Sequence, residues 1–160
     1  MGRLFDAVAA LCGLRSQVSY EGQAAVELEP WADGGDGPGY ALPLIDEGDR
    51  RVIDPRAAIL AVADDVAAGM PAAMVSARFH EGVARATAKA CAEAAERRGL
   101  ELVVLSGGVF QHRLLLERTA ALLEAAGLRA LVPGRLPPND GGIAYGQAAV
   151  AAARDRARAL

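Results

Sequence analysis

The residues whose types and spacing suit a chemical role lie in two glycine-containing motifs in the second half of the chain. The first is Ser106-Gly107-Gly108 and the second is Asn139-Asp140-Gly141-Gly142. Glycines let the backbone turn tightly and bring its N–H groups close to an anion, so the first motif is typical of a phosphate-binding turn. A carboxylate followed by glycines suits a cation and the phosphates that it bridges. Each motif also has a plainer interpretation, a simple strand-to-helix turn or a helix N-cap worth about 1 kcal/mol.

Two strand-loop-helix units surround these motifs. Residues 102–105 are apolar without alternation, which predicts a strand covered on both faces, as in a parallel sheet. A helix over about residues 111–126 follows, and its positive N-terminal end is expected to point at the first motif. The second unit is a strand over residues 128–132 and a helix from residue 139 to about 156. Parallel strands joined by a crossover helix place their following loops at one sheet edge, so we expect the two motifs to lie side by side.

The histidines and cysteines add little support for further sites. His80 is predicted at the polar edge of a long helix, whereas His112 directly follows the first motif and is better placed to meet a ligand. Two histidines so far apart in the sequence do not predict a metal site. Cys12 and Cys91 fall on separate predicted helices without a CxxC pattern, so we interpret both as small core residues.

The first half of the chain is predicted to be mostly helical and to form one α/β domain, residues 1–160, with the second half. Apolar periodicity and stop signals predict four helices, over residues 3–12, within the YEGQAAVELEPWA stretch, and over residues 55–68 and 72–98. A hairpin with a longer turn is expected over residues 40–45 and 51–53. The glycine- and aspartate-rich segment over about residues 32–39 is predicted to be a flexible loop.

Charge and hydropathy argue against nucleic acid and membranes as partners. The chain has 17 basic and 20 acidic residues, a net charge of -3, and no block of like charge. Asp64 and Asp65 interrupt its longest apolar region, and no run reaches the roughly 18 apolar residues of a membrane span. Asp6 lies inside an N-terminal apolar run without a cleavage site, which indicates an amphipathic helix and a cytoplasmic location. That helix has almost no lead-in, so we expect a chain whose start has been cut.

Five motifs together resemble the C-terminal end of the HypF carbamoyltransferases of [NiFe]-hydrogenase maturation. They are GRLFDAVAALCGL, YEGQAAVELE, ARFHEGVARA, SGGVFQHRLLLER and PPNDGGIAYGQA, in that order. The last domain of this family is similar to the universal tRNA threonylcarbamoyladenosine (Kae1-like) enzymes. The resemblance therefore implies part of an actin-like, sugar-kinase-like ATPase lobe of the ribonuclease H type, with a small mixed sheet and flanking helices.

The resemblance also implies an activity and roles for particular residues. Carbamoyl phosphate and ATP would give a carbamoyl-adenylate, whose carbamoyl group passes to a C-terminal cysteine of the partner protein HypE. Ser106, Gly107, Gly108 and Asn139 would lie at the nucleotide phosphates, and Asp140 would bind a divalent metal of unassigned identity. The nucleoside and substrate pocket would be lined by Gly2, Asp6, Glu21 and Gly22. No catalytic residue is assigned.

Two departures from the family shape these expectations. His112 stands where the family usually has asparagine, and the clustered histidines that complete the family's metal site are absent, as are its upstream domains. We therefore expect a piece of the enzyme, either a truncated gene product or the partner of a separately encoded first lobe, with little activity or ATP affinity alone. The alternatives are a non-catalytic interaction module that keeps the nucleotide-binding lobe, and an unrelated nucleotide-sugar binder with a Rossmann-like half.

Overall fold

A computed structural model describes residues 1–32 and 37–158 of the chain. Its helices are α1 (Gly2–Leu11), α2 (Gln23–Leu28), α3 (Arg56–Ala67), α4 (Ala72–Arg98), α5 (Arg113–Ala125) and α6 (Ile143–Arg158). Its strands are β1 (Leu44–Glu47), β2 (Arg50–Ile53), β3 (Leu102–Val104) and β4 (Arg129–Leu131), and short 3₁₀ helices are η1 (Glu29–Ala32), η2 (Gly108–Gln111) and η3 (Asp140–Gly142). The prediction of an α/β fold with small sheets and flanking helices is confirmed.

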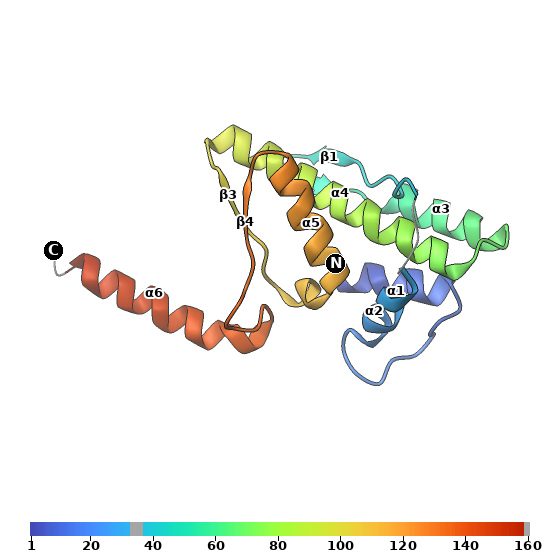
Figure 1. The fold of residues 1–160 in the computed structure, drawn as a ribbon, viewed down its shortest axis with the longest axis horizontal. Coiled ribbons are helices and arrows are strands. Elements are labelled where there is room, and N and C mark those ends of the chain that lie inside the picture. Colours follow the sequence, from blue (N-terminus) through green and yellow to red (C-terminus); the bar gives the residue numbers. More distant parts are fainter. Residues whose placement is uncertain (33–36, 159–160) are drawn as a thin grey trace.

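Helix α4 is the element on which the others pack. It runs through the main body with α3 and α5 against it (Figure 1), and it also contacts η1 and β2. Its apolar stripe includes Val75, Phe79 and Val83, which are almost fully buried because α1, α2 and α5 cover that side. Phe79 packs edge-on against Phe5 of α1, with ring centroids 5.0 Å apart.

The segment beginning at Gly37 is fixed to α4 by backbone contact. Tyr40 donates its N–H to the carbonyl of Arg78 at 3.0 Å, and its hydroxyl donates to Asp65 at 2.6 Å. Gly82 of α4 lies in direct contact with this segment. The contact leaves no room for a side chain, since a Cβ at Gly82 would stand 2.4 Å from the Tyr40 carbonyl oxygen. Residues 33–36, the centre of the predicted flexible loop, lie outside the described residues.

Strands β1 and β2 form an antiparallel hairpin with a tight turn. Glu47 pairs with Arg50, so only Gly48 and Asp49 remain between the strands. The predicted longer turn is wrong because Asp46 and Arg51 belong to the ladder, where their side chains form an ion pair of 3.0 Å. Two-residue turns containing glycine suit the twist of such hairpins.

Strands β3 and β4 are parallel, as predicted, but the expected burial of β3 on both faces is wrong. Val103 and Leu105 pack against the helices, whereas Leu102 and Val104 are 39% and 63% exposed. In the described part of the chain α4 and α5 cover one face of this pair, and the opposite face is open.

The C-terminal helix α6 leads away from the main body (Figure 1). None of its described residues is buried, and its main contacts are with η3. Among the helices of residues 1–32 and 37–158, none has the length and apolar character to cross a membrane.

Cys12 and Cys91 are unpaired half-buried thiols. Cys12 packs against the buried cluster that contains Phe5 and Phe79, and Cys91 packs against a second buried cluster of Ala88, Leu105 and Leu123, in agreement with the prediction of small core residues. Burial raises the pKa of both thiols, which favours their neutral form.

Candidate functional site

The two glycine-containing motifs lie side by side, as their topology predicts. Gly107 donates its N–H to the carbonyl of Pro138 at 2.7 Å, which ties the loop after β3 to the loop after β4. A hollow of about 660 Å³ opens between them. Its walls include Ser106, Gly107, Asn139, Asp140, Pro133, Gly134, Arg135, Leu136, Pro137, Pro138, Gly142, Ile143, Tyr145 and Gly146.

Backbone geometry explains the glycines of these motifs. Gly107 has a φ of +104°, which a residue with a side chain rarely adopts, and a Cβ at Gly142 would stand 2.7 Å from the carbonyl oxygen of Pro137. Gly108 lies outside the wall of the hollow but next to Asn139. The N–H of Gly107 is bound to Pro138 and is not free for a phosphate in this structure, and the assignment of Gly107 to the nucleotide phosphates stays a prediction.

Asn139 and Asp140 have different environments at the start of η3. The Asn139 side chain accepts the N–H of Gly141 at 3.1 Å, so it caps the turn. The Asp140 carboxylate is exposed at the hollow and forms no hydrogen bond or ion pair within the described residues. The guanidinium of Arg135 lies in the same wall. The sequence does not predict Arg135 as a site residue, and its place between β4 and the second motif is the one feature of the sequence that points to this role.

The positive N-terminal end of α5 is not available to bind an anion at the first motif. The helix begins at Arg113, after η2, and the N–H of Leu114 is bound at 2.7 Å by the carboxylate of Glu29 from η1. The expected anion at this helix terminus is therefore already supplied by the protein's own carboxylate.

This contact predicts a moderate loss of stability on substitution of Glu29. Replacing Glu29 by alanine is expected to lower the free energy of unfolding by about 1–2 kcal/mol, because the first turn of α5 loses its acceptor. Glutamine keeps an acceptor oxygen, so Glu29→Gln is expected to lose less than half as much. Urea unfolding followed by circular dichroism measures both changes, and equal losses in the two variants would contradict the capping role.

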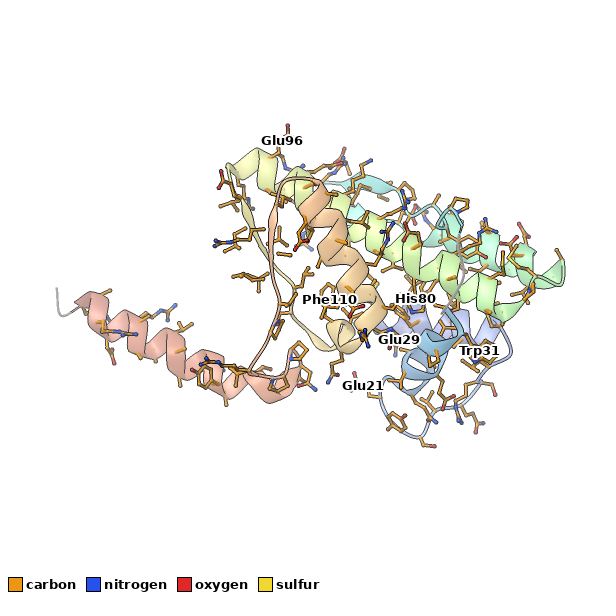
Figure 2. The ribbon with its side chains drawn as sticks, in the orientation of Figure 1. Glu21, Glu29, Trp31, His80, Glu96 and Phe110 are labelled. Atoms are coloured by element: carbon orange, nitrogen blue, oxygen red, sulfur yellow. The ribbon has the colours of Figure 1, made fainter. Side chains whose placement is uncertain are left out.

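The remaining predicted site residues lie in a different part of the molecule. Gly2 and Asp6 belong to α1, and Gly22 precedes α2. Glu21 is exposed on the loop before that helix (Figure 2). None of the four lines the hollow between the two motifs, so the structure does not bring the two predicted groups together. Their assignment to a nucleoside pocket stays a prediction.

The predicted place of His80 at a polar helix edge is wrong, because its side chain is buried in the core, and the side chain of His112 is buried beside it. Their exposed fractions are 2% and 5%, and their rings stack with centroids 5.6 Å apart beside Phe5. His80 and Glu29 lie near the start of α5 (Figure 2). His80 Nδ1 lies 2.8 Å from the Ser76 carbonyl oxygen, so it carries the ring proton and donates it.

Burial controls the protonation of this pair. It lowers the pKa of His80 to about 4, although the hydrogen bond to the Ser76 carbonyl acts in the opposite direction. It also lowers the pKa of His112, whose Nδ1 lies 3.9 Å from the Glu29 carboxylate that partly offsets the effect. Both imidazoles are therefore neutral at physiological pH.

The described residues do not by themselves fit a firmly held metal ion. Across residues 1–32 and 37–158, no group of three or more histidine, cysteine, aspartate or glutamate side chains converges. Asp140 offers one carboxylate, and the Asn139 oxygen is already used by Gly141. Divalent cations of the magnesium and calcium type need more oxygen ligands than this.

Comparison with known proteins finds a consistent set of relatives. A family model described as "Carbamoyltransferase, Kae1-like Domain, second subdomain" matches residues 1–147. The carbamoyltransferase HypF of Synechocystis sp. is 36% identical over 152 residues, which are 92% of this chain and 18% of that protein. HypF of Rhodobacter capsulatus is 40% identical over 154 residues, which are 96% of this chain and 19% of that protein.

A solved structure shows the same fold. The crystal structure of full-length HypF in a phosphate- and nucleotide-bound form superposes with a TM-score of 0.89 at 41% identity. The match covers 94% of this chain and 20% of that one. The chain thus spans about a fifth of the length of these relatives.

Proposed function

The chain belongs to the HypF carbamoyltransferase family, as a Kae1-like second subdomain, and we propose that it supplies the phosphate-binding part of a nucleotide site used in carbamoyl transfer. The observation that carries this proposal is the Gly107–Pro138 hydrogen bond, which joins two loops around one hollow. Open α/β sheets place ligands at such an edge. The nucleotide and phosphate bound by the similar full-length protein support the proposal.

Within the hollow, the chemistry of each side chain suggests its role. The Ser106 hydroxyl and the Arg135 guanidinium are the groups that suit nucleotide phosphates, and Asp140 suits a cation that accompanies them. Ligands from outside the described residues would have to complete the metal site. We therefore assign no reaction step to a metal.

The reaction we propose for the complete assembly is the transfer of a carbamoyl group to a thiol. Carbamoyl phosphate and ATP are the substrates. Hydrolysis of carbamoyl phosphate releases inorganic phosphate and carbamate, and a carbamate oxygen then bonds to the α-phosphorus of ATP as pyrophosphate leaves, which gives the carbamoyl-adenylate as the activated species. The C-terminal cysteine thiolate of a HypE-like acceptor forms a C–S bond with the carbamoyl carbon, and AMP leaves with the electrons of the C–O bond. A first lobe and further HypF domains supply the rest of the site, and the reaction takes place in the cytoplasm.

The alternative is a non-catalytic module that keeps this lobe and binds a partner protein. The open outer face of β3 and β4, with Val104 63% exposed, favours it. The two proposals differ in whether ATP binds once the other lobe is present.

Calorimetric titration of ATP and magnesium into the chain, with and without a separately expressed first lobe from the same genome, tests the proposal. Binding is expected only with the added lobe, because a nucleotide in such folds lies between two lobes. Asp140→Asn and Arg135→Gln are each expected to weaken it by about tenfold, the effect of one charge-assisted contact.

Asp155→Asn is the matched control, because it removes an exposed carboxylate from α6 outside the hollow. It is expected to leave the affinity unchanged. If a folded chain binds no ATP in the presence of the first lobe, the transferase proposal fails and the interaction module remains.

A further inference from the structure

Strand β3 has one edge to which no other strand is bound. Its other edge is bound to β4, where Leu105, directly after β3, donates its N–H to the carbonyl of Leu131 at 2.9 Å. Successive residues of a strand direct their backbone groups to opposite sides, so Leu102 and Val104 direct theirs to the free edge. No turn or loop of the described part of the chain binds these groups. Two N–H donors and two carbonyl acceptors are therefore open to a further strand.

This free edge is apolar and carries no residue that would block strand pairing. Among the described strands, β1, β2 and β4 contain charged side chains, such as Asp46, Arg51 and Arg129, whereas β3 contains none. Leu102 and Val104 are exposed on the sheet face that α4 and α5 leave open. Charged and proline residues on an edge normally keep it from pairing with another chain. The edge of β3 therefore indicates a surface that pairs with a strand.

We propose that two copies of the chain pair antiparallel through β3, with Leu102 of each copy opposite Val104 of the other. The twofold axis passes beside Val103, so each free N–H of the edge meets a free carbonyl of the second copy. The two copies then form one four-stranded sheet. The paired residues are not among those that line the nucleotide hollow, so this interface is separate from the function proposed above.

A second copy fits this edge in length, polarity and charge. Its β3 is equally short and uncharged, and its donors and acceptors are in the matching order. On the open face Leu102 of each copy contacts Val104 of the other, an aliphatic cross-strand pair. The register also places Glu101 of each copy opposite Leu105 of the other, so the two carboxylates lie at opposite ends of the pair and do not repel one another.

The dimer is expected to be weak, because three paired residues in each copy bury much less than the roughly 1,200 Å² of a standard interface. We expect a Kd on the order of 100 µM. Sedimentation velocity of the chain at loadings from about 10 µM to about 1 mM spans this value. The weight-average mass is expected to rise from that of one copy towards that of two, without larger species.

Hydrogen exchange distinguishes strand pairing from a less specific contact. Amide exchange with water, measured by nuclear magnetic resonance, is expected to slow about threefold for Leu102 and Val104 between about 50 µM and 1 mM, which is the fall in free chain for this Kd. The N–H of Val103 faces β4 in the same strand and is expected to show no change with concentration.

Two lysine substitutions on the open face assign the contact to the edge. Val104→Lys places a charge on the free edge and is expected to raise the Kd at least about tenfold. Leu131→Lys makes the same change on the same face but on β4, one strand away from the edge. It is the matched control and is expected to leave the Kd unchanged. Both side chains are exposed, and circular dichroism shows whether each variant is folded.

Three results would overturn the proposal. A folded chain that has the mass of one copy at about 1 mM does not pair in this way. Equal weakening by Val104→Lys and Leu131→Lys would assign the contact to the apolar face and not to the edge. If the chain alone is monomeric and Val104→Lys abolishes its binding to a separately expressed first lobe, the edge takes a strand of that lobe instead.

Discussion

Replacing Gly82 by alanine is expected to lower the free energy of unfolding by about 2–3 kcal/mol, the effect of overpacking a rigid contact. A Cβ at this position would stand 2.4 Å from the Tyr40 carbonyl oxygen and 3.0 Å from Leu42 Cδ1. Alanine favours a helix over glycine by about 1 kcal/mol, so the steric term has to exceed that gain. Either the segment around Tyr40 moves away or α4 bends. Both responses weaken the Tyr40–Arg78 backbone hydrogen bond.

The midpoint of thermal unfolding, followed by circular dichroism, is the measurement. For a chain of this size the loss corresponds to a fall of about 6–9 °C. Gly39→Ala meets the same contact from the other side, with its Cβ 2.4 Å from Gly82 N, and is expected to be similarly destabilised. Gly146→Ala on α6, where a Cβ would have nothing within 4 Å, is the control for the substitution itself. A Gly82→Ala variant as stable as the control would disprove the close contact.

Helix α4 is the best predicted element because its signals are local. Pro71 stands at its N-cap, Arg97 and Arg98 occupy its last turn, and Gly99 ends it with a φ of +62°. Each signal acts within a few residues of the helix end. Its predicted bounds and those in the structure are the same.

The start of α5 is not predictable in this way, because a distant residue determines it. Glu29 lies 85 positions before Leu114, whose N–H it binds. The sequence around the Ser106-Gly107-Gly108 turn shows an apolar run and glycines but gives no sign of this contact. The adjacency of the two motifs depends only on strand order and was predicted, whereas the use of the Gly107 N–H by Pro138 depends on loop geometry.

The predicted place of His80 at a polar edge is wrong, although its helical spacing carries the signal of a buried position. Ser76 lies one turn before it and Ala84 one turn after it, and both are fully buried. A small or apolar residue on either side at this spacing indicates a core-facing stripe. For β3 the error has another origin, since an apolar strand shows only that both faces can be covered.

Mild acid is expected to destabilise the folded chain through His80 and His112. An unfolded histidine has a pKa near 6.5, whereas burial lowers that of folded His80 to about 4. Below pH 6.5 the unfolded state therefore takes up a proton that folded His80 does not, so stability falls as the pH drops from 6.5 towards 4. Above pH 6.5 both forms are neutral and His80 contributes no pH dependence. Linkage gives a loss from His80 of about 2 kcal/mol by pH 5.

Urea unfolding between pH 7 and pH 5 measures this loss. The quantity to compare between proteins is the change in the free energy of unfolding with pH, not the free energy at any one pH. His80→Gln removes the titrating group, and the free energy of unfolding is expected to fall by about 2 kcal/mol less than in the unmodified chain over that range. His112→Asn introduces the amide usual in the family and removes the second buried imidazole, whose pKa burial also lowers. It is expected to flatten the profile in the same direction. Parallel profiles for all three proteins would show that carboxylates alone cause the acid sensitivity and that the buried imidazoles take no part in it.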